Sequence, residues 1–177
     1  MSRAITRDVR SCRAVFAMLG LLLLAAPAAA QGSLSGNSII CTNSANPRFP
    51  AVRTLYFSGQ RIFQYDAIGK KASSAGIVYN IGGQNSGRGT GDLTYQSSAQ
   101  VSASQVSLSA TVEQTCGICD GRRITVNESF SVSLQGDSGN ATRSYRQSFA
   151  DGTAVAVPGG SDSYSCRVVK GRRGVGG

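Results

Sequence analysis

The sequence predicts an all-β domain, an antiparallel β-sandwich or small barrel of about eight strands, stabilised by disulfides and preceded by an N-terminal signal peptide. The first observation is the alternation of apolar and polar residues through 92–135, because a period of two places one set of side chains on each face of a strand. The second is that four cysteines follow the leader, an even number. The third is the lack of helix-forming runs of Ala, Leu, Glu and Lys.

Residues 1–30 have the features of a signal peptide. Arginines precede an apolar run from Ala14 to Ala26, and the small residues 28–30 offer a cleavage site. This run is shorter than the roughly 20 residues that span a bilayer. We therefore expect an exported protein of bacterial type, periplasmic or secreted, with no integral membrane segment once the leader is removed. Residues 31–169 then form a single β domain, and 170–177 form a basic Gly/Arg tail without order.

Strand and turn signals follow one another along the domain. The segment 82–92 is rich in glycine, and we expect a mobile loop there; a ligand loop acting through Arg88 is the alternative. Near the C-terminus, Pro158-Gly159-Gly160 should stop a strand at 153–157, and a last strand should hold Tyr164, Cys166 and Val168. Before the glycine-rich loop, strands are expected at 38–42, 52–58, 61–66 and 77–81.

The two long alternating runs that meet at residues 116–121 predict a β-hairpin. Residues opposite each other in an antiparallel pair share a face, so Val112 should lie opposite Val126 or Ile124. Asp120-Gly121 tolerates the positive φ angle that such a turn needs. The next turn is expected at 136–139. The apolar residues before it (Phe130, Val132, Leu134) share a face with those after it (Ala141, Tyr145, Phe149) only if the numbers of paired residues add up to an odd sum. A four-residue loop provides such a register. These runs therefore form a three-stranded meander.

Glu128 is the exception on the apolar side of this meander. In the expected register it lies opposite Gln147. We favour a position at a sheet margin or barrel mouth where the carboxylate reaches water, because unpaired buried acids are rare. The alternative is a buried acid with a functional role.

The cysteines Cys41, Cys116, Cys119 and Cys166 predict two disulfides. We favour Cys116 with Cys119 across the hairpin tip and Cys41 with Cys166 between the first and last strands. In the alternative, Cys41 and Cys166 each bond one cysteine of the tip. A thioredoxin-like site at Cys116-Gly-Ile-Cys119 would need a helix after the first cysteine, and a zinc ribbon would need a second close pair. The sequence offers neither feature.

Several function classes are excluded or disfavoured by composition. The chain has no histidine, so mechanisms that need a catalytic histidine and histidine metal sites are excluded. We expect no enzyme, no cofactor and no nucleic-acid partner. The net charge of +9 allows attraction to an anionic envelope polymer. The candidate ligand surface comprises Arg88, Arg122, Arg123 and Glu128.

The sequence thus favours an exported, non-enzymatic β protein that binds an envelope component or a protein. Two alternatives stay open. One is a thiol-disulfide redox protein that uses Cys116 and Cys119. The other is a structural subunit of a surface assembly that pairs through an open sheet edge.

Overall fold

Eleven β-strands form one sheet in the computed structural model, which describes residues 34–43, 50–68, 71–72, 76–89, 91–117 and 119–173. Ten strands follow the order β4-β3-β2-β1-β11-β10-β9-β8-β7-β6, and β5 pairs with β3 off this path. The strands are β1 Asn37–Thr42, β2 Val52–Ser58, β3 Arg61–Ile68, β4 Lys71–Ala72, β5 Ile77–Asn80, β6 Gln84–Arg88, β7 Thr94–Val101, β8 Gln105–Thr115, β9 Arg123–Gln135, β10 Ser138–Phe149 and β11 Ala154–Lys170.

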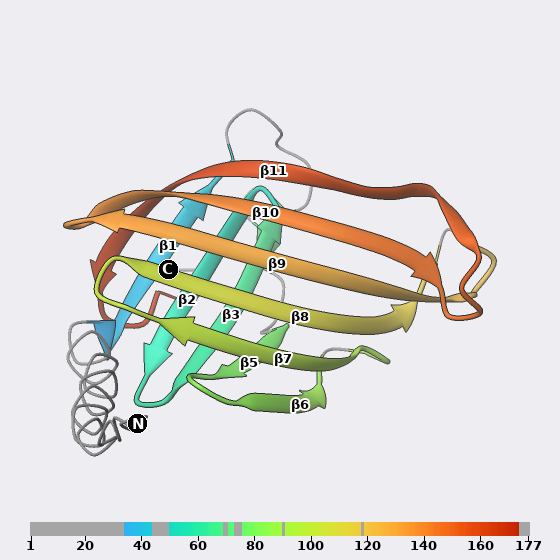
Figure 1. Ribbon diagram of the computed structural model, residues 1–177, viewed down its shortest axis with the longest axis horizontal. Helices are drawn as coiled ribbons and strands as arrows, with labels where there is room; N and C mark the ends of the chain where they lie inside the picture. Colours follow the sequence, from blue (N-terminus) through green and yellow to red (C-terminus); the bar gives the residue numbers. More distant parts are fainter. Residues whose placement is uncertain are drawn as a thin grey trace, which may run out of the picture.

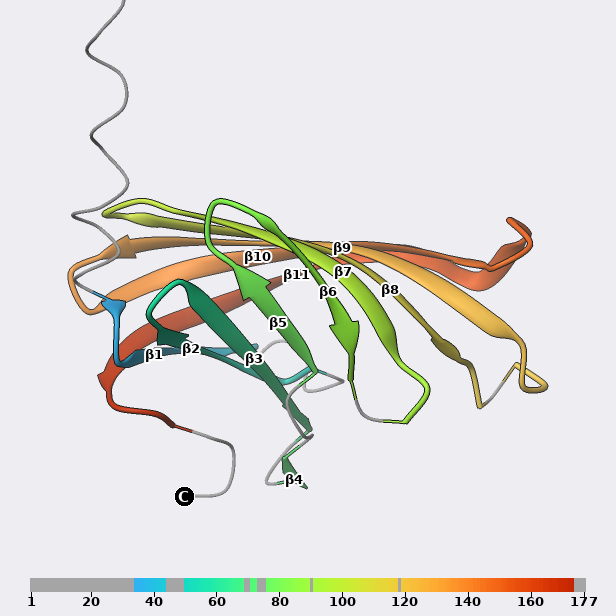
Figure 2. The same ribbon diagram turned by 90° about the horizontal axis from the view of Figure 1, so that it is seen from below.

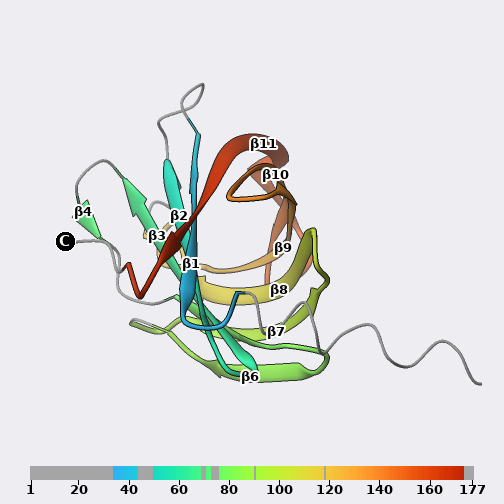
Figure 3. The ribbon, with the colours of Figure 1, turned by 90° about the vertical axis from the view of Figure 1, so that its left-hand side faces the viewer.

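The sheet curls into a nearly closed barrel. The long strands β7–β11 run across the front of the molecule, and β1–β3 cross behind them at a steep angle (Figure 1). Seen end-on, the strands surround a common core (Figure 3). Gly82 N–H donates a 2.8 Å hydrogen bond to Ala99 O, which links the segment after β5 to β7. The prediction of an all-β antiparallel fold is confirmed, but the barrel has more strands than the eight expected.

Apolar side chains from both sets of strands fill the barrel. Ile39, Leu55 and Ile62 from β1–β3 are fully buried, as are Val106 and Val132 from the long strands. Burial of this alternating set gives each long strand one inner and one outer face. The long strands continue past the end of β1–β3, so their far ends project as a wing (Figure 2). In the described ranges no helix has the length and apolar character that a membrane crossing requires.

The disulfides follow the favoured pairing. Cys41 and Cys166 lie directly opposite each other in the β1–β11 ladder, with 4.1 Å between their Cα atoms. Cys116 and Cys119 bond across the tip between β8 and β9. One bridge therefore joins the first strand to the last, and the other closes a single turn.

The register predictions were partly right. Val112 lies opposite Val126, as one of the two registers required. Between β9 and β10 the numbers of paired residues add up to an odd sum, as expected. The turn has two residues instead of the expected four, however, because Gln135 pairs with Ser138. Gly136 adopts a φ of +63° there, which a tight hairpin turn of this length requires at its first position. The shorter turn places Tyr145 opposite Glu128, where we expected Gln147.

Two expected breaks in the sheet are absent. The glycine-rich loop contains β6, which pairs along β7 from Gln84 to Arg88 because Gly87 leaves room for the Tyr95 ring opposite it. β11 continues through Pro158, where its pairing with β10 shifts between Arg146 and Ser148. The proline thus lies in an irregular segment where no ladder hydrogen bond is required of its nitrogen.

The predicted ends of the domain can be compared only in part. The leader and residues 174–177 lie outside the described residues. Lys170 to Arg173, which we expected in a tail without order, make defined contacts: Lys170 pairs with Asn37, and Arg172 Nη2 donates a 2.8 Å hydrogen bond to Tyr65 Oη. Ser38 Oγ donates to Gly171 O. That part of the tail prediction was wrong, because aromatic and hydroxyl groups of β1–β3 bind the chain end.

Loss of the two disulfides should have unequal effects on stability. In the chain-entropy model, bridging about 125 residues stabilises by about 5 kcal/mol and bridging four residues by about 2 kcal/mol. We expect C41S/C166S to lower the free energy of unfolding by the larger amount and C116S/C119S by the smaller, measured by urea denaturation. An equal or larger loss in C116S/C119S would contradict this assignment.

Candidate functional site

A buried ion-pair cluster lies inside the barrel. Arg53 of β2 and Asp66 of β3 lie directly opposite each other, and both side chains point inward. Glu128 of β9 reaches them from the long strands. The Arg53 side chain is 1% exposed and that of Glu128 is 7% exposed. The favoured position of Glu128 at a water-filled margin was therefore wrong, since the carboxylate is buried and paired.

Arg53 binds both carboxylates at once. Its Nε and Nη2 donate 2.8 Å hydrogen bonds to the two carboxylate oxygens of Asp66, and its Nη1 donates a 2.5 Å bond to Glu128 Oε1. The guanidinium carbon also lies 4.8 Å from the centroid of the Phe130 ring. A planar guanidinium suits this arrangement, because its donors can serve two carboxylates while its face contacts an aromatic ring.

A second arginine completes the cluster. Arg143 Nε donates a 2.6 Å bond to Glu128 Oε2, and its Nη1 lies 3.4 Å from Asp162 Oδ2. Arg143 lies opposite both Phe130 and Asp162 in the neighbouring ladders, so β9, β10 and β11 each place one member on the inner face. The cluster thus joins β2 and β3 to three of the long strands.

The electrostatics of the cluster keep Glu128 ionised. Burial alone would raise the pKa of Glu128, but the Arg53 and Arg143 guanidiniums outweigh burial and lower it below its ordinary value. Burial would lower the pKa of Arg53, yet Asp66 and Glu128 raise it well above its usual range. Burial raises the pKa of Tyr164 to about 12, and this hydroxyl donates to Pro50 O. Glu128 therefore stays ionised, Arg53 stays protonated and Tyr164 stays neutral near neutral pH.

The buried polar atoms of the cluster all have partners. Within the described ranges, every buried side-chain nitrogen or oxygen has at least one hydrogen-bond partner. Gln64 donates to Asp66, and Tyr79 donates in turn to Gln64. These bonds tie the two sets of strands together.

The structure separates the four residues of the predicted ligand surface. Glu128 is inside the barrel, whereas Arg122 and Arg123 are at the tip of the wing. Arg122 binds Asp151 at 2.7 Å, with Phe149 under its guanidinium, and Arg123 lies 3.5 Å from Asp92 and 3.6 Å from Glu113. Arg88 ends β6 on the outer face, opposite Thr94. The two tip arginines are therefore neutralised by neighbouring acids.

The hairpin tip lacks the setting of a redox disulfide. Cys116 N–H donates to Arg122 O and Cys119 N–H donates to Cys116 O, which are turn hydrogen bonds between strands. No helix follows the first cysteine, because residues 119–121 form a turn that leads into β9. A low thiolate pKa would need a helix dipole or an unpaired cation nearby.

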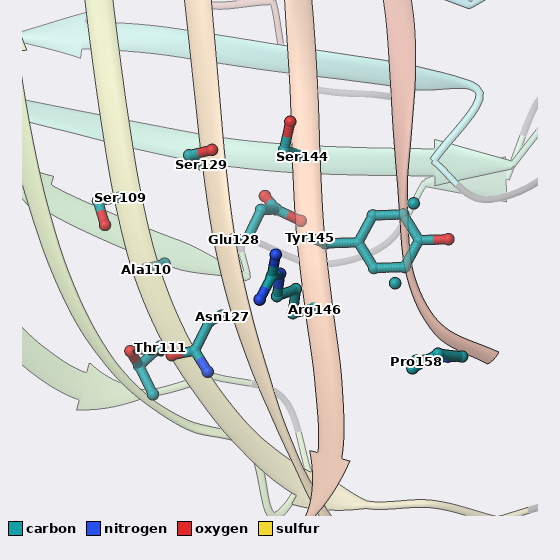
Figure 4. A pocket seen from close by; sticks show the side chains of 12 residues that line it. Ser109, Ala110, Thr111, Asn127, Glu128, Ser129, Ser144, Tyr145, Arg146 and Pro158 are labelled. Carbon is teal, nitrogen blue, oxygen red and sulfur yellow. Dashed lines mark hydrogen bonds between the residues drawn. The ribbon is translucent and has the colours of Figure 1, made fainter. Parts of the chain in front are cut away.

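A second candidate site lies on the outer face of β6–β11. Here small polar side chains, together with the Tyr145 ring and Pro158, line a hollow of about 770 Å³ over β8–β11 (Figure 4). Its lining includes four exposed residues, Ser109, Asn127, Ser129 and Ser144. Each follows or precedes an inward-pointing residue in its strand, so its own side chain points outward. Arg146 lies between β9 and β10 in this hollow (Figure 4) and makes no ion pair with any described residue. Sequence analysis did not single out this surface.

Two further hollows continue the first toward the sheet edge. One of about 370 Å³ shares Ser109 and Thr111 with it and extends over β6 and β7. Another of about 460 Å³ shares Ser86 and Gln96 with the second and reaches Arg88 and Glu113. Together they form a trough across the outer face of β6–β11.

Comparison with protein-family models, with curated proteins and with solved structures found no match.

Replacing Arg53 should destabilise the fold strongly. R53M removes one guanidinium and leaves Asp66 and Glu128 buried with too few donors, at a cost of about 3–5 kcal/mol. The matched control is R123M, whose arginine is 43% exposed and pairs with exposed acids, so its cost should stay below about 1 kcal/mol. Urea unfolding of both variants measures the difference. If R53M and R123M lose the same free energy of unfolding, the buried ion pairs contribute no more to stability than the exposed ones.

Glu128 should also give the protein an acid-sensitive stability. Its pKa is lower in the folded than in the unfolded protein, so the unfolded state binds this proton first as pH falls. The stabilisation is complete above the unfolded pKa of about 4.3 and is lost as pH falls through the lower, folded pKa.

Urea midpoints between pH 7 and pH 3 test this expectation. The unmodified protein should lose stability on acidification, and E128Q, already less stable at pH 7, should show a shallower slope below about pH 4.3. E113Q removes an exposed carboxylate on the outer face and should keep the original slope. An unchanged slope in E128Q would disprove the role of this carboxylate.

Proposed function

We propose that this chain is an exported, non-enzymatic β-barrel protein that binds a component of the cell envelope through the outer face of β6–β11. The observation that carries the proposal is the trough on that face, whose lining includes exposed serines and Arg146, a guanidinium with no ion pair among the described residues. The buried Cys41–Cys166 bridge is compatible with an oxidising compartment.

Binding fits the distribution of polar groups better than catalysis does. The buried carboxylates already serve the two arginines of the cluster, and the chain has no histidine to act as a general base. The outer face instead offers hydroxyl and amide groups that are accessible and fixed by the sheet. Rigid presentation lowers the entropic cost of binding.

The two alternative functions find less support. The arginines beside Cys116 and Cys119 are paired with acids, so they would do little to favour a thiolate. An assembly edge is offered by β11 between Ala154 and Tyr164, which has β10 on one side and no described strand on the other. Val157 is 57% exposed on this edge, but Pro158 and the irregular pairing there disfavour an added strand.

A charged side chain in the trough should abolish envelope binding. S129K places a long cation in the centre of the hollow and leaves the inner face untouched. The matched control is S133K, on the same strand and face but outside the lining. Cosedimentation with an envelope fraction from the native host should show binding by the unmodified protein and S133K, and at least a tenfold weaker affinity for S129K.

Circular dichroism of each variant verifies that the barrel is folded. If the unmodified protein fails to sediment with any envelope fraction, or if S129K binds as well as S133K, the outer face is not the binding surface.

A further inference from the structure

A row of serines crosses the outer face of the barrel. Consecutive strands place these residues opposite one another, so their hydroxyls share one face and follow one line across the sheet. The row runs from β7 to β11 through Ser98, Ser109, Ser129, Ser144 and Ser161, and Gln84 continues it onto β6. Neighbouring strands lie about 4.8 Å apart, so five intervals give a line of about 24 Å.

Polar, mostly uncharged side chains flank this line. On one side Ser86, Gln96, Thr111 and Asn127 lead to Arg146, and on the other Gln100, Ser107, Ser131 and Thr142 lead to Ser163. Arg88, Glu113 and Arg123 stand toward the wing, and Arg167 stands at the opposite end of the sheet. Among the described residues of these three rows Arg146 is the one charged side chain, although exposed sheet surfaces of soluble proteins usually carry many charges.

Most of these hydroxyls have unused hydrogen-bonding capacity. Ser161 Oγ donates to Arg143 O and Thr111 Oγ1 donates to Asn127 Oδ1. In the part of the chain that the structure describes, the hydroxyls of Ser98, Ser109 and Ser129 engage no other protein group. Each serine can donate one hydrogen bond and accept others, which matches the mixed donor and acceptor character of a sugar hydroxyl.

We propose that the trough binds an uncharged, hydroxyl-rich polysaccharide chain lying across β6–β11. This inference rests on the proposed function and names the class of ligand. Serine loses little side-chain entropy when it is fixed, so an array of serines suits many weak hydrogen bonds to a polyol. The length of the trough suits a polymer, because the line of serine hydroxyls crosses five strands and Gln84 extends it onto a sixth.

Other ligand classes fit this face less well. Protein interfaces draw most of their energy from clusters of buried aromatic and arginine residues, and the lining of the first two hollows holds one aromatic ring, that of Tyr145, and one arginine, Arg146. An anionic polymer would need several accessible cations, but Arg123 is paired, and Arg88 and Arg146 stand apart in different hollows.

Affinity electrophoresis in gels that contain a defined polysaccharide tests the ligand class. The probes are uncharged glucans and mannans, with polygalacturonate as the anionic counterpart. We expect retardation by at least one uncharged polymer, little changed by 0.5 M NaCl, because hydrogen bonds between neutral groups are not screened. S129K should weaken the retardation at least tenfold, and S133K should change it less than twofold.

A series of oligosaccharides from the retarding polymer then tests the geometry. Affinity should rise with oligosaccharide length until the chain spans about 24 Å and should then level off. S98K, at the far end of the trough, should weaken binding of long oligosaccharides more than that of short ones.

The outcomes separate this inference from the function on which it rests. Retardation only by polygalacturonate, removed by salt, would overturn the uncharged ligand. Binding to the envelope fraction without retardation by any polysaccharide would also overturn it and would leave the proposed function standing. If the unmodified protein binds neither the envelope fraction nor any polysaccharide, the proposed function and the ligand class are both overturned.

Discussion

The ion pairs of Arg53 are the constraint on which this barrel depends. A guanidinium that is 1% exposed must find carboxylates inside the fold, and it finds Asp66 on the adjacent strand and Glu128 across the core. Because Glu128 also holds Arg143, the short strands and the long strands are joined by charge as well as by apolar contact. Guanidinium–carboxylate pairs form only in a narrow range of distances and angles, so they restrict the angle at which the two sets of strands cross. Apolar packing alone would allow a wider range of crossing angles.

The two faces of the long strands differ in how many of their polar side chains are hydrogen-bonded within the protein. On the inner face every buried side-chain nitrogen or oxygen within the described ranges has a hydrogen-bond partner. On the outer face the residues alternating with the core are small and hydroxylated, and several keep their donors and acceptors open. A rigid barrel with one saturated and one unsaturated face suits a protein that presents a surface to a ligand.

The disulfides support this arrangement without entering the functional surface. Cys41–Cys166 closes the chain between its first and last strands, beside the segment where Ser38 and Tyr65 bind residues 171–173. Cys116–Cys119 shapes the tip of the wing, where Arg122 stacks on Phe149. Both ends of the long strands are thereby anchored, which keeps the face between them in a fixed shape.

The sequence by itself determined the strand class, the two faces of the strands on either side of the Cys116–Cys119 tip and the number of disulfides, because these depend on local periodicity and on the count of cysteines. The pairing of the cysteines was left open and depends on the register of β1 with β11. It also marked Glu128 as a charge on an apolar face, whereas Arg143, which lies on the same phase of the neighbouring strand, was a second such signal that was not singled out. Only the tertiary structure brought Arg53 and Asp66 to them, since the partners lie 75 and 62 residues from Glu128 in the chain and meet when the sheet curls. The continuity of the serine row was likewise decided by register, because the length of each turn sets which serines stand side by side.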